Sequence, residues 1–286
     1  MPSTPGTGTS TAAPPHEPLP PGTVLPSLTA GQLSEMLILI RDADSVELKL
    51  TVADAQQRSA VAALGMDPLD AEIRQVAFFD TPDLDLYRGG VVVRARRMQR
   101  KSGDTVVKLR PLDADQLGGA LRKTPGFGVE LDAMPGGFVC SGSLKGTASA
   151  QKVKKVFSGL KPVRVLLSKG QQALFDRHAP SGISLEHLAL LGPITILKLK
   201  FSHPGYSHRL VAELWFYPDG SRILELSTKC DPADAFAVAA ETKAFLAGEG
   251  VDLMAAQQTK TLTALRFFAD ELASERRVTA DGHDRA

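Results

Sequence analysis

The chain has 286 residues, enough for one large domain or two small ones, and its hydrophobic content of 43% is typical of a folded globule. Its 33 basic and 32 acidic residues nearly cancel, which argues against an extended nucleic-acid surface and leaves a local basic site open. No apolar run approaches the roughly 18 residues needed to span a bilayer, so the sequence predicts no membrane helix.

The first 32 residues have the composition of a disordered tail rich in Pro, Ser and Thr. Eight of the first 30 residues are proline, and Glu17 is the only carboxylate among them. Such a segment cannot bury enough apolar surface to offset its chain entropy. It lacks the basic and apolar regions of a secretory signal, and a Pro-rich docking segment is the functional alternative. We expect ordered structure to begin near Leu33.

Strand patterns dominate from there to about residue 216. The segment SVELKLTV (45–52) alternates sharply, with Val46, Leu48 and Leu50 on one face. A short helix is expected over 53–64, ending at Gly65, and another over 151–159. Further strands are expected at 73–79, 91–98, 105–110, 128–132, 163–168, 194–201, 210–216 and 222–228.

The C-terminal part changes from strand to helix patterns. Asp231 and Pro232 have the form of an N-cap followed by proline at the first helical position, and this helix should end at Gly248. A second helix, expected over 252–274, carries an apolar stripe that indicates core packing. The stripe consists of Leu262, Leu265, Phe268 and Leu272. The charged residues 277–286 should fray.

Many strands of similar length with few long helices between them predict an α+β protein built on one closed antiparallel β-barrel, because closure removes exposed strand edges. We expect this barrel domain over 33–230, with a C-terminal helical pair over 231–276 packed on it. A closed barrel offers apolar surface to such helices on its outside. The charged strand faces would then point into the interior of the barrel, the lumen, which inverts the usual arrangement.

The charged residues of the strands follow the period of two that places them on one face. Eight cations on these faces outnumber five carboxylates, and buried surplus charge needs a partner. A polyanion with phosphate groups suits Arg and Lys, whereas carboxylates suit Mg²⁺ or Mn²⁺. The predicted phosphate-binding residues are Lys49, Arg94, Arg96, Lys108, Arg110, Lys198, Lys200 and Lys229. The predicted metal ligands are Glu47, Glu130, Asp132, Glu213 and Glu225.

Four motifs follow one another along residues 45–229. SVELK (45–49) is close to an ExExK strand, with Ser45 in place of the first Glu. FFDTPDLDLYRGGVVVRARR (78–97) joins an aromatic-Asp-Thr-Pro segment to an RxR strand, and the basic VVKLR (106–110) and acidic GVELD (128–132) follow. In this order the motifs resemble the CYTH superfamily, the triphosphate tunnel metalloenzymes. Its members include class IV-type adenylate cyclases, thiamine triphosphatases and inorganic triphosphatases.

The resemblance implies a triphosphate ligand and, if the protein is an enzyme, metal-assisted hydrolysis of a triphosphate. The residues implied to bind phosphate are Arg94, Arg96, Lys108 and Arg110. The residues implied to hold the metal are Glu47 and Glu225, with Glu130 and Asp132 supporting the metal or the basic cluster. The ligand is expected to be a small molecule, with no membrane involved.

Three residues depart from the pattern of the family. Ser45 and Ser227 stand where family members have acids, and Gln171 stands where they commonly have an arginine. The loss of two carboxylates threatens a second metal ion, and two-metal chemistry needs both. Two alternatives therefore stay open. One is a non-catalytic polyphosphate-binding or nucleotide-binding module with a degenerate metal site, and the other is a class IV-type adenylate cyclase.

Other features of the sequence favour ordinary explanations. Cys140 and Cys230 have no CxxC spacing and are expected to be free thiols of a reduced, cytoplasmic protein. The basic run RARRMQRK (94–101) lacks the interleaved aromatics of a nucleic-acid site. His203 and His208 flank a Pro-Gly turn and suggest a surface loop. The sequence contains no Walker loop, no GxSxG and no HExxH motif.

Overall fold

The computed structural model describes residues 29–113 and 121–283, with side chains up to residue 274. The predicted tail lies outside these residues except for its end, where helix α1 (Ala30–Asp42) begins slightly before the expected start near Leu33. The last helix, α7 (Lys260–His283), continues past residue 276. Fraying of 277–286 remains a prediction, because those side chains lie outside the described residues.

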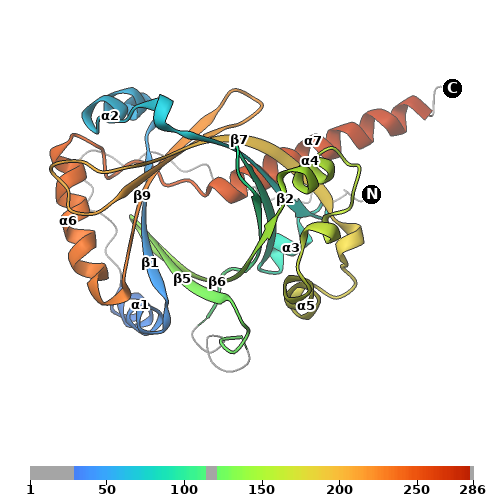
Figure 1. Cartoon of the computed structure of the whole chain (residues 1–286), viewed down its shortest axis with the longest axis horizontal. Coiled ribbons are helices and arrows are strands. Elements are labelled where there is room, and N and C mark those ends of the chain that lie inside the picture. The colour runs from blue at the N-terminus through green and yellow to red at the C-terminus, as the bar shows by residue number, and fades with distance from the viewer. Residues whose placement is uncertain (1–28, 114–120, 284–286) are drawn as a thin grey trace, which may run out of the picture.

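Nine strands in the described residues close into one barrel (Figure 1). Around the barrel their order is β1, β5, β6, β4, β3, β2, β7, β8, β9 and back to β1. Neighbours are antiparallel except β1 and β5, which are parallel. The strands are β1 Ser45–Val52, β2 Glu72–Asp80, β3 Val91–Met98, β4 Gly103–Leu109, β5 Phe127–Met134, β6 Gly137–Ala148, β7 Ala189–Phe201, β8 Leu210–Phe216 and β9 Arg222–Cys230.

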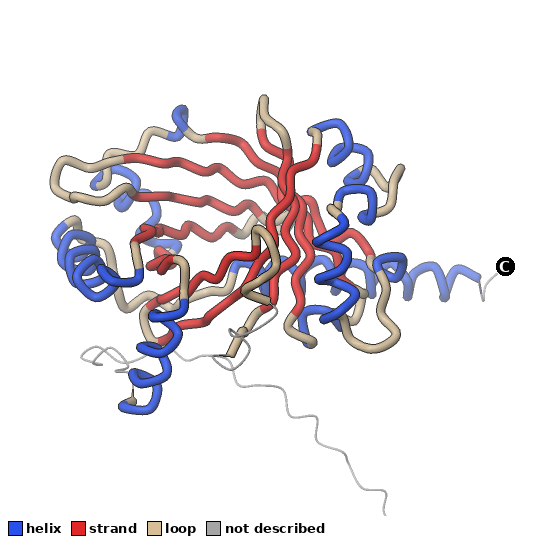
Figure 2. Tube along the Cα trace, turned by 60° about the horizontal axis from the view of Figure 1, so that its bottom comes forward, coloured by secondary structure: helices blue, strands red, loops and turns tan. Residues whose placement is uncertain are grey.

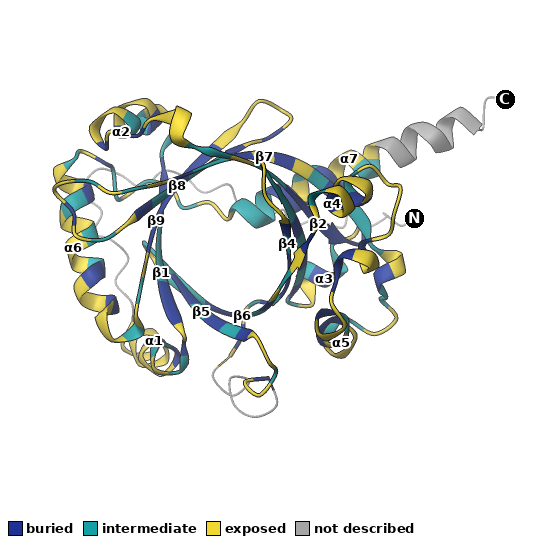
Figure 3. Ribbon diagram, in the orientation of Figure 1, coloured by how far each residue is buried: buried dark blue, intermediate teal, exposed yellow. Residues whose placement is uncertain are grey.

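Helices surround this barrel, and the predicted α+β fold class is confirmed (Figures 1 and 2). The strands are mainly buried or intermediate, whereas the helices around them carry many exposed residues (Figure 3). None of the helices in the described part of the chain combines the length and apolar character of a membrane span. The remaining helices are α2 Gln57–Ala63, α3 Asp85–Arg88, α4 Ala150–Phe157, α5 Lys169–His178 and α6 Ala235–Gly248.

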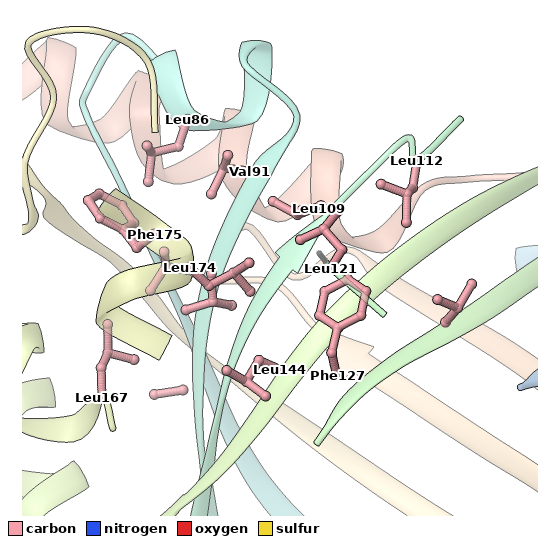
Figure 4. Close-up of a cluster of buried hydrophobic side chains, with 14 of the residues drawn as sticks. Leu86, Val91, Leu109, Leu112, Leu121, Phe127, Leu144, Leu167, Leu174 and Phe175 are labelled. Carbon is pink, nitrogen blue, oxygen red and sulfur yellow. The ribbon is translucent and has the colours of Figure 1, made fainter. Parts of the chain in front are cut away.

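Two apolar clusters hold helices on the outer face of the barrel. The larger one packs α1, α3, α4 and α5 against β3, β4, β5 and β6. Figure 4 shows the part of this cluster around Leu174 and Phe175 of α5. Phe175 of α5 and Leu131 of β5 are completely buried in it. The second cluster packs α2 and the end of α6 against β1, β7, β8 and β9 through residues such as Leu64, Leu246 and Leu226. Outward-facing strand residues thus form the core, as the alternation in 45–52 predicts.

The third apolar cluster lies on the inner face. Ala264, Leu265 and Phe268 of α7 pack against Val76, Ile194, Ile196, Trp215 and Ile223, whose positions in the strands point into the lumen. Of the expected apolar stripe of the last helix, Leu265 and Phe268 are buried in this cluster and Leu272 packs against it. Because the inward positions at this end are apolar, α7 covers one end of the lumen, and the charged residues occupy the rest.

The strand prediction was wrong at one segment and missed another. Residues 163–168 were expected as a strand, but Val163–Leu166 forms a 3₁₀ turn that buries Val163 and Leu166 in the outer cluster, and Ser168 caps α5. Strand β6 was not predicted, because it contains several glycines and glycine is depleted in strands. Its glycines are needed by tertiary contacts. A Cβ on Gly142 would lie 2.2 Å from the Phe127 ring, and one on Gly146 would lie 2.5 Å from Gln171 Oε1.

The predicted helices are present with shifted limits. The expected 53–64 helix consists of a 3₁₀ turn and α2, and α4 matches 151–159 closely. The last helix begins at Lys260 instead of 252. Its expected first turns are non-helical because Gln257 and Gln258 hydrogen-bond the backbone amide and the hydroxyl of Thr51 on β1. Helices α1, α3 and α5 were not predicted.

Asp80 organises the turn that follows β2. Its carboxylate is 2% exposed and accepts the backbone N–H groups of Thr81, Leu86 and Tyr87 at 2.7–2.9 Å. We expect Asp80→Ala to lower the free energy of unfolding by about 2–4 kcal/mol, because buried N–H groups lose their acceptor. Urea denaturation measures the change. Asp83→Ala, in the same turn but exposed, should change stability by less than about 0.5 kcal/mol, and an equal loss in both variants would contradict this role.

Candidate functional site

The charged face of the strands lines the lumen. On β1, Val46, Leu50 and Val52 are buried in the outer clusters, so Glu47 and Lys49 point inward. Strand pairing carries this face around the barrel, because directly opposite residues point to the same side. The predicted residues on inward positions are Glu47, Lys49, Arg94, Arg96, Lys108, Glu130, Asp132, Lys198, Lys200, Glu213, Glu225 and Lys229, and Arg110 follows β4 directly.

Asp132 is the centre of the first charged cluster. Its side chain is fully buried, with Oδ1 2.8 Å from Lys49 Nζ and Oδ2 2.7 Å from Arg110 Nη1. Burial alone would raise the pKa of Asp132, but the charges of Lys49, Lys108 and Arg110 outweigh it and lower the pKa to about 2. Asp132 therefore stays ionised and holds these cations in place.

Two further carboxylates join Asp132. Glu47 lies 3.0 Å from Lys49, and Glu130 binds Lys229 at 2.6 Å. Oxygens of Glu47, Glu130 and Asp132 all lie within 4.8 Å of one another. We call these three residues with Lys49, Lys108, Arg110 and Lys229 the Asp132 cluster.

The second cluster is built on β7, β8 and β9. Glu213 Oε1 lies 2.8 Å from Lys198 Nζ, and Glu213 Oε2 lies 2.7 Å from Lys260 Nζ. Lys260 also binds Glu225 Oε1 at 2.7 Å. We call Lys198, Glu213, Glu225 and Lys260 the Glu213 cluster. The two clusters divide the predicted metal ligands into separate groups of three and two.

Arg94 and Lys108 differ from the other inward-facing cations. Arg94 Nε is buried and has no hydrogen-bond partner in the described residues. Burial and the nearby charge of Arg96 lower the pKa of Arg94 to about 10. Lys108 lies 3.8 Å from Asp132, beyond hydrogen-bond distance. Burial lowers the pKa of Lys108 to about 8, although Asp132 acts in the opposite direction. These two cations lack full compensation by the protein.

Strand pairing brings these two cations together. Arg94 on β3 pairs with Val106 on β4, two residues before Lys108. The two side chains are thus diagonal neighbours on one face, within reach of a single extended anion. Arg96, by contrast, makes a bidentate bond to Asp104 at 2.7–3.0 Å. Lys200 is exposed, with no ion pair within the part of the chain that the structure describes.

The residues that depart from the CYTH pattern lie in different places. Ser45 and Ser227 occupy inward positions beside Glu130 and Lys49, respectively, so the missing acids would have lined the lumen. Gln171 lies outside the barrel on α5, where its side chain bonds Thr105 and the Leu144 carbonyl oxygen. An arginine absent from position 171 therefore removes no charge from the lumen.

Sequence reasoning missed several inward charges. Glu72 and Arg74 on β2 lie opposite the inward-facing Lys198 and Ile196 of β7 and bind each other at 2.5 Å. Asp104, opposite Arg96 on β4, follows the same alternation as Lys108 and could have been found from it. Lys260 lies on a helix, so no strand pattern marks it. Its contact with Glu213 and Glu225 depends on where α7 packs.

The three carboxylates of the Asp132 cluster fit a divalent ion. Oxygen donors from carboxylates are the ligands that Mg²⁺ and Mn²⁺ prefer. The donors lie close enough together for one ion. Lys49 and Lys229 bind the same three carboxylates, so an ion would compete with them.

Comparison with known protein families gives no match, and neither does comparison with curated protein sequences. The chain is similar to several solved structures, among them the following two. A proposed adenylate cyclase from Bacillus halodurans has a TM-score of 0.55 at 14% identity, over 79% of this chain and 98% of its own. A proposed adenylyl cyclase from Hippeastrum, reported to have a dominant triphosphatase activity, has a TM-score of 0.57 at 16% identity, over 76% of this chain and 93% of its own. The barrel of this chain therefore has the same fold as these two proteins.

Proposed function

We propose that the lumen binds a small-molecule triphosphate or polyphosphate, and that the chain is a CYTH-type domain. The observation that carries the proposal is the pair Arg94 and Lys108, two partly buried cations on adjacent strands without full compensation by carboxylates. A buried charge without a partner costs several kcal/mol, which a bound polyanion would recover. The fold shared with the triphosphatase from Hippeastrum supports the same ligand class.

The other cations have fixed positions beside this pair. Asp132 holds Lys49 and Arg110 in place through direct bonds. Arg94 and Lys108 would contact phosphate oxygens, with Arg110 at the edge of the same face. In hydrolysis, water attacks the terminal phosphorus and the bond to the bridging oxygen breaks. Diphosphate and orthophosphate then leave, and the cations stabilise the charge that develops on the oxygens.

A divalent ion, which we propose to be Mg²⁺ or Mn²⁺, would be held by Glu47, Glu130 and Asp132. When bound, it would supply further positive charge to the phosphate oxygens. These three side chains would bind and orient the ion, and the cations of the protein would neutralise the negative charge of the phosphate oxygens.

A second candidate function is binding without turnover. Ser45 and Ser227 stand at inward positions of the Asp132 cluster, and each carboxylate of the cluster already binds a cation. A polyphosphate-binding module would need the cations of the lumen but not a metal ion. Adenylate cyclase activity is the third alternative, which an assay for cyclic AMP distinguishes.

One experiment separates these functions. Purified protein is mixed with tripolyphosphate, thiamine triphosphate or ATP and with Mg²⁺ or Mn²⁺, and phosphate and cyclic AMP are measured beside calorimetric binding. Phosphate release supports the triphosphatase, whereas binding without product supports the binding module. Failure of tripolyphosphate to bind under any of these conditions would contradict the proposal.

Binding of tripolyphosphate should depend on pH through Lys108. Because the pKa of Lys108 is lowered to about 8, the side chain is charged below that pH and loses its charge above it. We expect the dissociation constant to rise by up to about tenfold per pH unit above pH 8. Calorimetry between pH 6.5 and 9.5 (about three units, spanning the shift) measures it. Lys108→Arg, which stays charged over this range, should abolish this rise of the dissociation constant. An equal rise in both proteins would show that titration of the ligand causes it.

A cytoplasmic location is proposed from the state of the two cysteines. Cys140 and Cys230 are both free, as expected of thiols in a reducing compartment. We propose the cytoplasm on this ground.

A further inference from the structure

We propose that Lys260 of α7 is a built-in cation that occupies the Glu213–Glu225 pair in place of a divalent ion, so that this pair binds no metal. The inference rests on the proposed function only in its choice of site, because the occupied pair belongs to the same lumen. It reassigns two of the five carboxylates that the sequence marked as metal ligands.

The two carboxylates need a cation between them. Glu213 and Glu225 are directly opposite one another on β8 and β9, and like charges at such positions repel. Both side chains are largely buried, at 16% and 10% exposed. Two facing acids of this kind are an arrangement that a divalent ion could satisfy. Here the ammonium of Lys260 bonds to both at 2.7 Å.

The ammonium of Lys260 is already bound by protein groups. Two of its three N–H donors bind Glu213 and Glu225, and the nitrogen lies 5.1 Å from the centre of the Trp215 ring, within the range of a cation–π contact. Burial by itself lowers the pKa of Lys260, but the charges of Glu213 and Glu225 outweigh burial and raise the pKa. The side chain is therefore charged. Together with Lys198, it makes the Glu213 cluster neutral.

Local helix preference does not explain the lysine at this position. Lys260 is the first residue of α7, where the positive end of the helix dipole disfavours a cation. Tertiary contacts hold it there instead. Gln257 and Gln258 bond Thr51 on β1, Tyr217 donates its hydroxyl to the Lys260 carbonyl oxygen, and the following turns of α7 fill the apolar end of the lumen. The helix thus brings the ammonium to the acid pair.

Counting bound Mn²⁺ tests the proposal. Free and bound Mn²⁺ are measured by electron paramagnetic resonance and calorimetry on the full chain, without nucleotide or polyphosphate. We expect Lys260→Ala to bind one more Mn²⁺ per chain than the wild type, because the acid pair is then empty. Lys155→Ala, which removes an exposed lysine of α4, should leave the count unchanged. In the double variant Lys260→Ala/Glu225→Gln the additional ion should be lost.

A second measurement covers the case in which Lys260→Ala does not fold without metal. Glu225→Gln in the otherwise unchanged chain should leave both the count and the affinity for Mn²⁺ as in the wild type, whereas Glu47→Gln should weaken binding. A lower count with Glu225→Gln, or an unchanged count with folded Lys260→Ala, would overturn the proposal. These results are distinct from the failure of the proposed function, which is absence of tripolyphosphate binding by the wild type.

Discussion

Replacing Arg94 or Lys108 by methionine is expected to weaken tripolyphosphate binding by about tenfold to a hundredfold without destabilising the fold. Charge-assisted hydrogen bonds are worth about 1.5–3 kcal/mol each, which sets the size of the loss. For Lys108, the lowered pKa means that the charged form is disfavoured in the folded protein. Its removal should therefore raise the free energy of unfolding at pH 7 by about 1–3 kcal/mol.

The neighbouring arginine provides the matched control. Arg96 lies on the same strand and the same face, but its guanidinium is bonded to Asp104. Arg96→Met leaves that carboxylate without its partner and should cost about 1–2 kcal/mol. Urea denaturation and calorimetry on Arg94→Met, Lys108→Met and Arg96→Met give both quantities. If Arg94→Met or Lys108→Met lost as much stability as Arg96→Met, the pair would be structural and the ligand argument would fail.

Asp132→Asn is expected to have the largest effect on stability. The carboxylate is fully buried between Lys49, Arg110 and Lys108, and removing one member of a buried ionic group typically costs about 3–5 kcal/mol. The variant should therefore unfold at a clearly lower urea concentration than the wild type. Asp176→Asn, at an exposed position of α5, should change stability by less than about 0.5 kcal/mol.

The acid dependence of unfolding tests the same residue. The folded pKa of Asp132, about 2, lies below its usual value of 3.8. Asp132 therefore contributes stability above pH 3.8, and this contribution is lost as the pH falls from there to about 2. The expected loss is about 2 kcal/mol, measured by urea unfolding across this range. Asp132→Asn should lack this part of the acid dependence, and an unchanged acid profile in the variant would contradict the role of Asp132.

Much of the barrel was predictable because strand alternation is a local property. In β1, β3 and β4, each residue faces the opposite side from its neighbour, so Val93 and Arg94 already indicate two different environments. Strand β6 was missed by the sequence prediction because its glycines are required by close contacts with Phe127 and Gln171. These two residues are distant from the glycines in sequence. The false strand at 163–168 has strand-like composition, but its residues pack as a turn beneath α5.

The sequence by itself determined the alternation of charged and apolar strand faces, and hence the closed barrel and its charged lumen. It did not determine which charges neutralise one another. Asp132 meets Lys49 and Arg110 only when β1, β4 and β5 lie in one closed barrel, and Lys260 meets Glu213 and Glu225 only because α7 packs into the apolar end. Side-chain direction depends on neighbouring residues, whereas ion pairing depends on distances between segments far apart in the chain. For this reason only the tertiary structure decided that Arg94 and Lys108 are partly buried cations without full compensation by carboxylates.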